Sequence, residues 1–431
     1  MFQTLANAWK IPELRKKLMF TVMILLIYRL CNVIPVPFVN GEILKQYYDA
    51  SLSDTIFGLY NAMSGSAFSM ATVLALGIQP YINASIIIQL LTVAIPALER
   101  MAKEEGEVGK KKIERITRYT TVGLGLLLGY AYYTMITGSA AQMGFSILET
   151  QNIWTAIAII LSFTAGACFV MWMGEQITEF GIGNGISMIL FANIIAGLPA
   201  GVGTMIDMFK VGNWWTPVII VVAMAVLVVF IVFINDAERR IPIQYAKRVV
   251  GRKVYGGQNT NLPIKVSMSG VMPVIFASSI CSIPATICAF IPGATADSNW
   301  WYKNVFSPNS WTYFAFYVLM IFFFSWFYST IQYDPVEISN NLKKNGGFIP
   351  GFRPGKPTSE FIQKVINKIV VFGAVYLAVV AGLPLIAGNL MTLGNLAIGG
   401  TSVIIVVGVA LETVKALEAQ MLMRHYKGFL D

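Results

Sequence analysis

Apolar runs of about twenty residues recur along the whole chain, and they limit its possible folds more than any other feature. A helix needs about 20 apolar residues to cross the hydrocarbon core of a bilayer. Only 12% of the 431 residues are charged, whereas soluble domains carry about 25%. The sequence therefore predicts an all-α polytopic membrane protein with ten transmembrane helices, at approximately 18–37, 70–95, 118–137, 153–173, 182–202, 215–235, 266–290, 312–330, 367–388 and 399–417.

Lysine and arginine are unevenly shared between the two sides that these runs define. The segments 1–17, 96–118, 236–265, 331–368 and 411–431 hold 27 of the 31 basic residues. The loops on the opposite side hold only Lys45, Lys210 and Lys303, and Arg29 lies within the first run. Because cytoplasmic loops are the ones enriched in lysine and arginine, both termini are predicted to be cytoplasmic. This bias also accounts for most of the net charge of +9.

One short motif occurs twice. Residues 80–85 read PYINAS and residues 273–278 read PVIFAS, with the same Pro, Ile, Ala and Ser at matching places. The copies lie in the second and the seventh run, so halves of five spans each run in opposite directions through the membrane. We therefore predict an inverted repeat with an N-terminal half at 1–210 and a C-terminal half at 211–431, and expect each proline to bend its helix. Chance matches in Ile/Ala/Ser-rich helices are the alternative.

The segment 54–68 precedes the second run on the external side. It is half apolar, but it is too short and too interrupted by Gly and Ser to span a bilayer. Segments of this kind are usually re-entrant or interfacial. We expect it to form a short helix that folds back towards the interior of the protein.

The predicted spans contain almost no ionisable residues, and this limits the possible functions. Ion-coupled transporters normally carry such groups within the membrane. The single histidine, His425, lies near the C-terminus, and no GxxxxGK[ST] sequence is present, so the sequence predicts no enzyme, no metal site and no cofactor. The glycine cluster at 181–185 opens a span and does not follow a strand. A secondary transporter for a small neutral solute stays open, because inverted repeats also build such carriers.

Aliphatic residues in the spans are spaced so that they could form a closing ring. Ile78 and Ile82 lie one helical turn apart, and so do Ile186 and Leu190. An apolar constriction can close a pore by excluding water, although composition alone favours ordinary packing for any one of these residues. Mild polar groups at Asn83, Ser85, Gln89, Thr121, Ser278 and Ser279 are expected to join helices by hydrogen bonds of about 1 kcal/mol each.

Two cytoplasmic segments are long and basic. The segment 236–265 carries Arg239, Arg240, Lys247, Arg248, Arg252 and Lys253. The segment 331–368 places Arg353 and Lys356 among glycines and prolines, which favour a shaped loop over a helix. Phe348, Ile349 and Phe352 are expected to be exposed beside these charges. Orientation in the membrane needs only a few charges, so these segments are predicted to form a docking surface for nucleic acid phosphates or an acidic protein.

Five stretches of the chain together resemble the SecY/Sec61-alpha family. They are GIQPYINASIIIQLL, GIGNGISMILFANIIAGLP, AKRVVGRKVYGGQNTNLPIKVSMSGVMPVIFASSI, GGFIPGFRPGKPTSEFI and GGTSVIIVVGVALETVKALEAQMLMRHYKGF. They occur in the expected order and cover nearly the whole chain. The resemblance implies a passive protein-conducting channel of the bacterial plasma membrane, with two five-helix halves arranged as a clamshell. Such a channel translocates unfolded secretory polypeptides and releases membrane segments sideways into the lipid.

The resemblance also implies roles for particular residues. The pore ring would be Ile78, Ile82, Ile186, Leu190, Ile275 and Ile405, with Ile404 as the alternative to the last. The plug would be 54–68, with Ile56, Phe57, Leu59, Met63 and Phe68 as its apolar residues. The lateral gate would be Asn83, Ser85, Gln89, Thr121, Ser278, Ser279 and Ile283. Leu190, Asn83 and Ile283 depart from the residues usual in the family but keep their physical character.

The implied partners are several. The subunits SecE and SecG would accompany the chain, and signal sequences and precursor polypeptides would pass through it into the channel or the membrane lipids. The SecA ATPase and the ribosome would share the surface formed by the two basic segments. Arg353 would be the residue most sensitive for coupling to the motor.

Overall fold

The computed structural model of the chain is mostly helical, and it describes residues 7–49, 56–103, 105–143, 147–148, 150, 152–210, 212, 214–245, 248–250, 253–255, 259–268, 270–289, 310–391 and 400–427. Ten helices carry the ten predicted apolar runs. They are α2 (Pro12–Cys31), α5 (Gln79–Ala94), α7 (Gly106–Met143), α8 (Ile153–Phe180), α9 (Gly185–Lys210), α10 (Trp215–Asp236), α11 (Met272–Ala289), α12 (Trp311–Gln332), α14 (Lys356–Met391) and α15 (Gly400–Lys427).

Several of these helices could cross a membrane by length and composition alone. Within the described residues, α8, α9, α10, α14 and the helical segment 311–344 are long and apolar enough. The last of these joins α12 to α13 (Pro335–Lys344). A sixth span would consist of α5 together with α6 (Pro96–Lys103), which meet at an angle of 105°. The helices α2, α7 and α15 add charged residues to their apolar runs.

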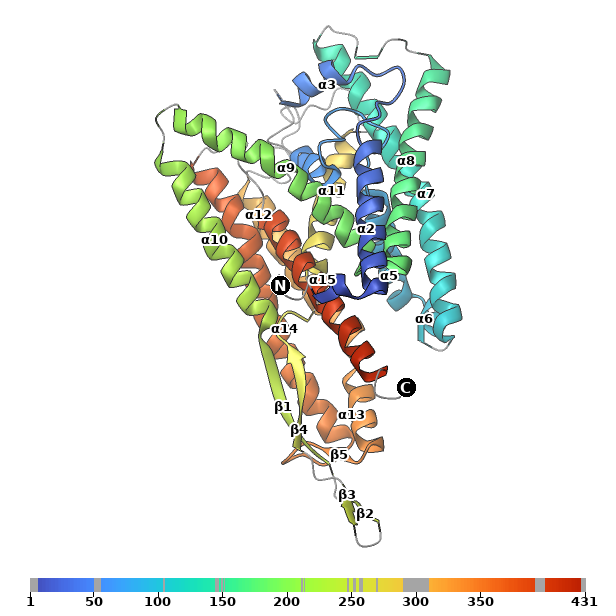
Figure 1. Ribbon diagram of the computed structural model, residues 1–431. Helices are drawn as coiled ribbons and strands as arrows, with labels where there is room; N and C mark the ends of the chain where they lie inside the picture. The colour runs from blue at the N-terminus through green and yellow to red at the C-terminus, as the bar shows by residue number, and fades with distance from the viewer. Residues whose placement is uncertain are drawn as a thin grey trace.

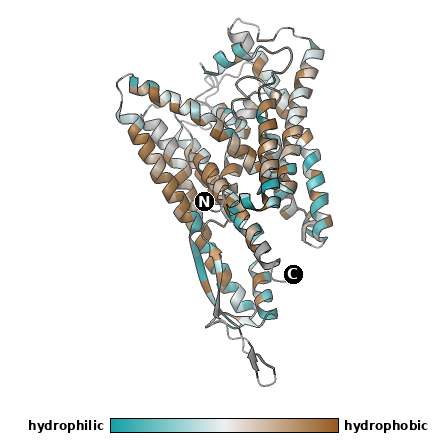
Figure 2. Ribbon diagram, viewed as in Figure 1, coloured by the Kyte–Doolittle hydropathy of each residue, from teal (hydrophilic) through white to brown (hydrophobic). Residues whose placement is uncertain are grey.

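The helices form two groups. Figure 1 shows α2, α5, α7 and α8 gathered on one side, α10, α12, α14 and α15 on the other, and α9 and α11 between them. Towards one end of the molecule lie α6, the start of α7, the end of α15 and α13, and α13 lies beside a small β-sheet. Figure 2 shows hydrophobic residues along the long helices, and more hydrophilic residues near that sheet and on α13. The segments with most of the basic residues therefore lie at the same end.

The two copies of the repeated motif begin helices and do not bend them. Pro80 lies in the first turn of α5, and Pro273 is the second residue of α11. Proline is favoured there because its missing N–H would have no helical partner. The expected bend at each proline was therefore wrong, and so was the expected helix from residue 70. Residues 65–78 form turns, with Gly77 at φ +53°, and α5 starts only at Gln79.

The segment predicted to fold back forms helix α4 (Ile56–Ser64). The chain then passes through the turns of residues 65–78 into α5. Residues 54 and 55 lie outside the described residues. Before this segment, α3 (Gly41–Tyr47) is capped by Asn40, whose side chain accepts a hydrogen bond from the Glu42 backbone N–H at 3.2 Å.

The two basic segments are more ordered than the predicted loops. Strand β1 (Glu238–Tyr245) pairs antiparallel with β4 (Asn259–Lys265) and with β5 (Gly347–Phe348). A short hairpin of β2 (Arg248–Val250) and β3 (Lys253–Tyr255) extends beyond this sheet. Alternating residues of the sheet pack on α13 and α14 in a separate apolar cluster. Ile349 belongs to that cluster and is buried, so its expected exposure was wrong, whereas Phe352 is exposed.

Candidate functional site

Six aliphatic side chains predicted to form a ring lie in one buried cluster at the centre of the helices. They come from the start of α5, from α9, from α11 and from α15, and so from segments far apart in the chain. Five of them are 4% exposed or less, and the sixth, Ile186, is partly buried against the same cluster. The six are Ile78, Ile82, Ile186, Leu190, Ile275 and Ile405. Ile404, the alternative to the last, is buried there too.

The glycine cluster before α9 positions two members of this ring. Helix α8 ends at Phe180, and Gly183 takes a φ of +74°, which L side chains rarely adopt. The Asn184 side chain then accepts a hydrogen bond from the Ile186 backbone N–H at 3.0 Å and so caps α9. Gly185 lies so close to α8 that an added Cβ would meet the Gly174 carbonyl oxygen at 1.9 Å. The tight turn is what brings α9 back along α8 into the cluster.

The C-terminal end of α4 is held by side chains from α2 and α9. Asn193 Nδ2 donates to the Met63 carbonyl at 2.7 Å, and also to the Tyr28 hydroxyl at 2.8 Å. Asn32 Nδ2 donates to the Ser64 carbonyl at 3.3 Å and to the Gly65 carbonyl at 3.1 Å. The Arg29 guanidinium also donates to the Gly65 carbonyl, at 3.1 Å. We call Arg29, Asn32 and Asn193 the polar clasp, since they satisfy carbonyls that a helix end leaves without intrahelical partners.

The opposite end of α4 is held mainly by aromatic contacts. Phe57 stacks on Phe68 with ring centroids 5.7 Å apart, and Phe68 lies 4.6 Å from Tyr132 of α7. The Tyr132 hydroxyl donates to the Phe68 carbonyl. Of the predicted plug residues, Met63 lies in the same cluster as the ring, and Phe68 in a second cluster with α7 and α8. Ile56 and Leu59 lie in α4, with side chains outside the described set.

An apolar cavity of about 200 Å³ lies between α4, α5, α7 and α11. Three of the seven predicted gate residues line it: Asn83, Ser279 and Ile283. Aliphatic side chains supply most of the remaining wall, together with the ring of Tyr60. Ile283 and Ile287 are 45% and 55% exposed, so the cavity wall on α11 reaches the outer surface of the helices.

The polar residues predicted to join helices across this seam bond mostly within their own helices. Thr121 donates to the Thr117 carbonyl at 2.7 Å, and Ser278 donates to the Ile275 carbonyl at 2.8 Å. Gln89 Nε2 donates to Ser85 Oγ on the same helix at 3.3 Å. Ser279 Oγ is buried without a hydrogen-bond partner. Most of these residues therefore do not tie helices together, which differs from the expectation; the exception is Gln89, whose side chain also hydrogen-bonds to the Tyr328 side chain of α12.

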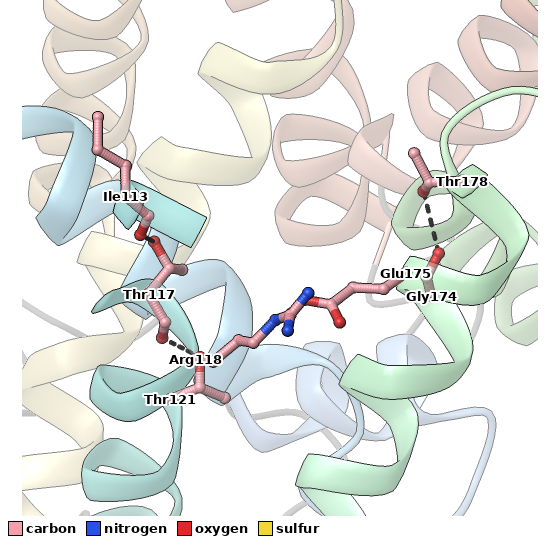
Figure 3. Close-up of polar contacts among 7 residues, drawn as sticks. All are labelled: Ile113, Thr117, Arg118, Thr121, Gly174, Glu175 and Thr178. Atoms are coloured by element: carbon pink, nitrogen blue, oxygen red, sulfur yellow. Dashed lines mark hydrogen bonds and ion pairs between the residues drawn. The ribbon is translucent and has the colours of Figure 1, made fainter. Parts of the chain in front are cut away.

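One ion pair fixes the helices on one side of the seam to each other. Figure 3 shows Arg118 of α7 reaching Glu175 of α8, with an N–O distance of 2.8 Å, one turn before Thr121. The Thr121 hydroxyl points back along α7, and the Thr178 hydroxyl donates to the Gly174 carbonyl within α8. The pair joins α7 to α8, so it leaves the contact between α7 and α11 free to open.

The comparisons with known proteins agree on one family. The SecY family model matches residues 72–414. The chain is 43% identical to the protein translocase subunit SecY of Streptomyces galbus over 439 residues, covering 100% of both chains. It is 41% identical to that of Mycobacterium bovis, again over 100% of both. The chain belongs to the SecY family.

Solved structures support the fold of this SecY chain. A structure described as a protein-conducting channel superimposes with a TM-score of 0.70 at 17% identity, over 94% of this chain and 92% of that one. A second, whose plug domain is described as stabilising the closed state, superimposes with a TM-score of 0.64 over the same shares of both chains, again at 17% identity. The family model and the full-length relatives at 41 to 43% identity, and not these structures, show that the chain is a protein translocase subunit and not an enzyme. The channel function expected from the resemblance is therefore confirmed, and the small-solute carrier is not supported.

The basic residues predicted for docking lie at the end of the SecY molecule that carries the sheet. Arg239 and Arg240 are exposed on β1, Arg353 is exposed in the turn before α14, and Lys356 is exposed as the first residue of α14. That turn is tied down at two points, because Thr358 donates to the Arg353 carbonyl and Ser339 of α13 donates to the Gly355 carbonyl, both at 2.8 Å. Arg248 and Lys253 lie in the β2–β3 hairpin with side chains outside the described set, and Lys247 and Arg252 lie outside the described residues.

Sequence reasoning missed two groups of residues at this SecY site. The polar clasp was overlooked, although amides at Asn32 and Asn193 inside or beside apolar runs were a usable signal. The aliphatic wall of the gate cavity was also missed, and it includes Ile86, Ile87, Leu124 and Leu128. No sequence signal separates those side chains from ordinary packing residues. Within the described residues, no group of three His, Cys, Asp or Glu side chains is placed to hold a metal ion.

Proposed function

We propose that the aliphatic ring is the seal through which unfolded secretory polypeptides pass. An unfolded chain presents every type of side chain, so a fixed polar site would trap some of them. A ring of aliphatic groups contacts all of them weakly, and it excludes water when it closes on itself. The observation that carries this proposal is the convergence of six predicted side chains from four separate segments into one buried cluster.

Helix α4 is proposed to be the plug on the external side of this ring. Met63, in its last turn, packs in the ring cluster, and the polar clasp keeps that end in place. A passing polypeptide displaces the helix, because α4 and the polypeptide compete for the same space. The division of the chain into halves at 1–210 and 211–431 is part of the same proposal, with the seam between α5, α7 and α11 as the lateral gate.

The gate cavity is proposed to receive the apolar part of signal sequences and membrane segments. Its wall is aliphatic and borders the outer surface of the helices, so an apolar segment can move from the cavity into lipid without crossing a polar barrier. Burial of apolar area then favours entry by about 25 cal/mol per Å². Asn83 and Ser279 contribute the few polar groups of the wall.

The basic end of the molecule is proposed to face the cytoplasm of the cell that carries this chain in its plasma membrane, with both termini on that side. The surface around Arg239, Arg240 and Arg353 would dock the ribosome and the SecA ATPase, which supply the driving force. SecE and SecG are proposed as further subunits. The support is the charge on exposed, ordered segments, which attracts nucleic acid phosphates and acidic surfaces.

Polar substitution of the ring tests the proposed function. In the triple variant Ile82→Asn, Ile186→Asn and Ile275→Asn, the ring should hold water at rest, because amides replace the groups that exclude it. The resting ion conductance of the purified channel in planar bilayers should rise by about an order of magnitude or more. The matched control exchanges the same residues for Val. A resting conductance equal to that of the Val control would remove the ring assignment.

A further inference from the structure

Helix α4 is held by contacts with two different parts of the molecule. The polar clasp on α2 and α9 holds the carbonyls at its C-terminal end. At the middle of α4, the Tyr60 hydroxyl donates a hydrogen bond of 3.0 Å to Ser282 Oγ of α11. The first contact stays within the proposed N-terminal half, whereas the second crosses the seam that the proposed gate opens.

The acceptor of this bond is well placed to respond to movement of α11. The Ser282 side chain is buried, and its hydroxyl donates to the Ser279 carbonyl one turn earlier at 2.5 Å. Its oxygen is therefore oriented with a lone pair available to Tyr60. Ser282 lies between Ser279 and Ile283 in the chain, and both of these residues line the gate cavity. Tyr60 lines the same cavity. The bond thus lies at the wall of the space that an apolar segment would enter.

We propose that the Tyr60–Ser282 hydrogen bond is a latch that couples the position of the plug to that of the gate. When α11 moves away from α5 and α7, the bond breaks, and α4 loses its hydrogen bond to the moving helix, so displacement of α4 costs less. Coupling of this kind is reciprocal, so displacement of α4 also favours an open gate. The inference rests on the proposed roles of α4 as plug and of α11 as gate helix.

Removal of either hydroxyl tests the latch with little change in shape. Tyr60→Phe keeps the aromatic ring, and Ser282→Ala keeps the helix. Each variant should raise the open probability of the full chain in planar bilayers by about 2- to 10-fold, the equilibrium factor that corresponds to one net hydrogen bond. The double variant should exceed the larger single effect by little, because both changes remove the same bond.

Tyr132→Phe is the matched control. It also removes a tyrosine hydroxyl that bonds to the plug region, but its partner is the Phe68 carbonyl and not a group on α11. Its effect on open probability should therefore add to that of Ser282→Ala. Additive effects of Tyr60→Phe and Ser282→Ala would overturn the latch.

A second measurement separates a latch from simple loosening of the plug. The gate is held closed by a bifunctional maleimide between Ile87→Cys and Ile283→Cys, both in the cavity wall, in a chain whose native cysteines are replaced by Ala. Tyr60→Phe should then lose its effect on open probability. An unchanged effect in the crosslinked channel would contradict coupling to the gate. If Tyr60→Phe kept its effect in the crosslinked channel while the triple Asn variant of the ring showed a raised resting conductance, the latch alone would be overturned. The proposed function would then stay in place.

Discussion

The ring and the gate cavity are both built from aliphatic side chains, yet they are packed very differently. The ring residues Ile82, Leu190 and Ile275 are 4% exposed or less and belong to one continuous cluster. The gate residues Ile283 and Ile287 are about half exposed and border a cavity of about 200 Å³. The same kind of side chain is therefore tightly packed in the ring, whereas it borders an incompletely filled space in the seam.

In the proposed mechanism, packing and not polarity separates the ring, which closes, from the seam, which opens. A well-packed interior loses many contacts when it separates, whereas a seam with a cavity has few contacts to lose. The seam is weakened further because Ser279 keeps a buried hydroxyl without a partner, and Thr121 and Ser278 bond within their own helices. We therefore expect the gate to open at a lower free-energy cost than the cluster around the ring takes to come apart.

Truncation of a residue in each region should give the largest contrast. Leu190→Ala removes a fully buried side chain and should lower the free energy of unfolding by about 2–5 kcal/mol, because it leaves a cavity in the packed cluster. Ile283→Ala should cost less than about 1 kcal/mol, because its side chain already borders open space. Thermal unfolding of the purified variants measures both values. Equal losses would show that the two regions are packed alike.

A polar residue in the gate wall should affect substrates more than stability. Ile87→Asn places an amide in the cavity wall, so apolar segments should enter less readily, and insertion of a weakly apolar signal sequence should fall by about 10-fold. Ile87→Leu is the control, and it should behave as the unchanged chain. Insertion into vesicles that contain the purified variants is the measurement. Equal insertion by both variants would mean that this wall does not contact the substrate.

A charge outside both regions should change neither of them. Arg353→Glu should leave unfolding and resting conductance unchanged, because Arg353 is exposed and its turn lies beside α13 and α14, whose apolar cluster with the sheet is separate from the cluster that holds the ring. Motor-driven translocation should fall, since the proposed docking surface loses a positive charge. Lys364→Glu, an exposed residue of α14, is the matched control. A similar loss of translocation in the control would point to net charge and not to a specific contact.

Several features could be predicted because they depend on local chemistry. Apolar runs of membrane length located the ten helices, and the spacing of Ile78, Ile82, Ile186 and Leu190 indicated one face each of α5 and α9. The segment 54–68 was predicted not to span the membrane, because it is short and Gly and Ser interrupt it. Proline was misjudged, since the sequence alone does not show whether a proline starts a helix or bends it.

Other features depend on contacts between distant residues and could not be predicted. The strands β1 and β4 pair across residues 246–258, and α13 and α14 cover one face of the sheet that they form. Ile349 is buried for the same reason, although its neighbours in sequence suggested exposure. The polar clasp joins Arg29 and Asn32 to carbonyls about 32 to 36 residues away and Asn193 to one 130 residues away.

By itself, the sequence determined that this chain crosses a membrane, that the motifs at residues 80–85 and 273–278 are alike, and which aliphatic residues could close a pore. These properties follow from hydropathy and helical periodicity, which each short stretch contains. Only the tertiary structure decided that the ring is packed while the gate is not, and that Tyr60 reaches Ser282 across the seam. Packing density and cross-helix hydrogen bonds depend on which surfaces meet, and no local pattern specifies that.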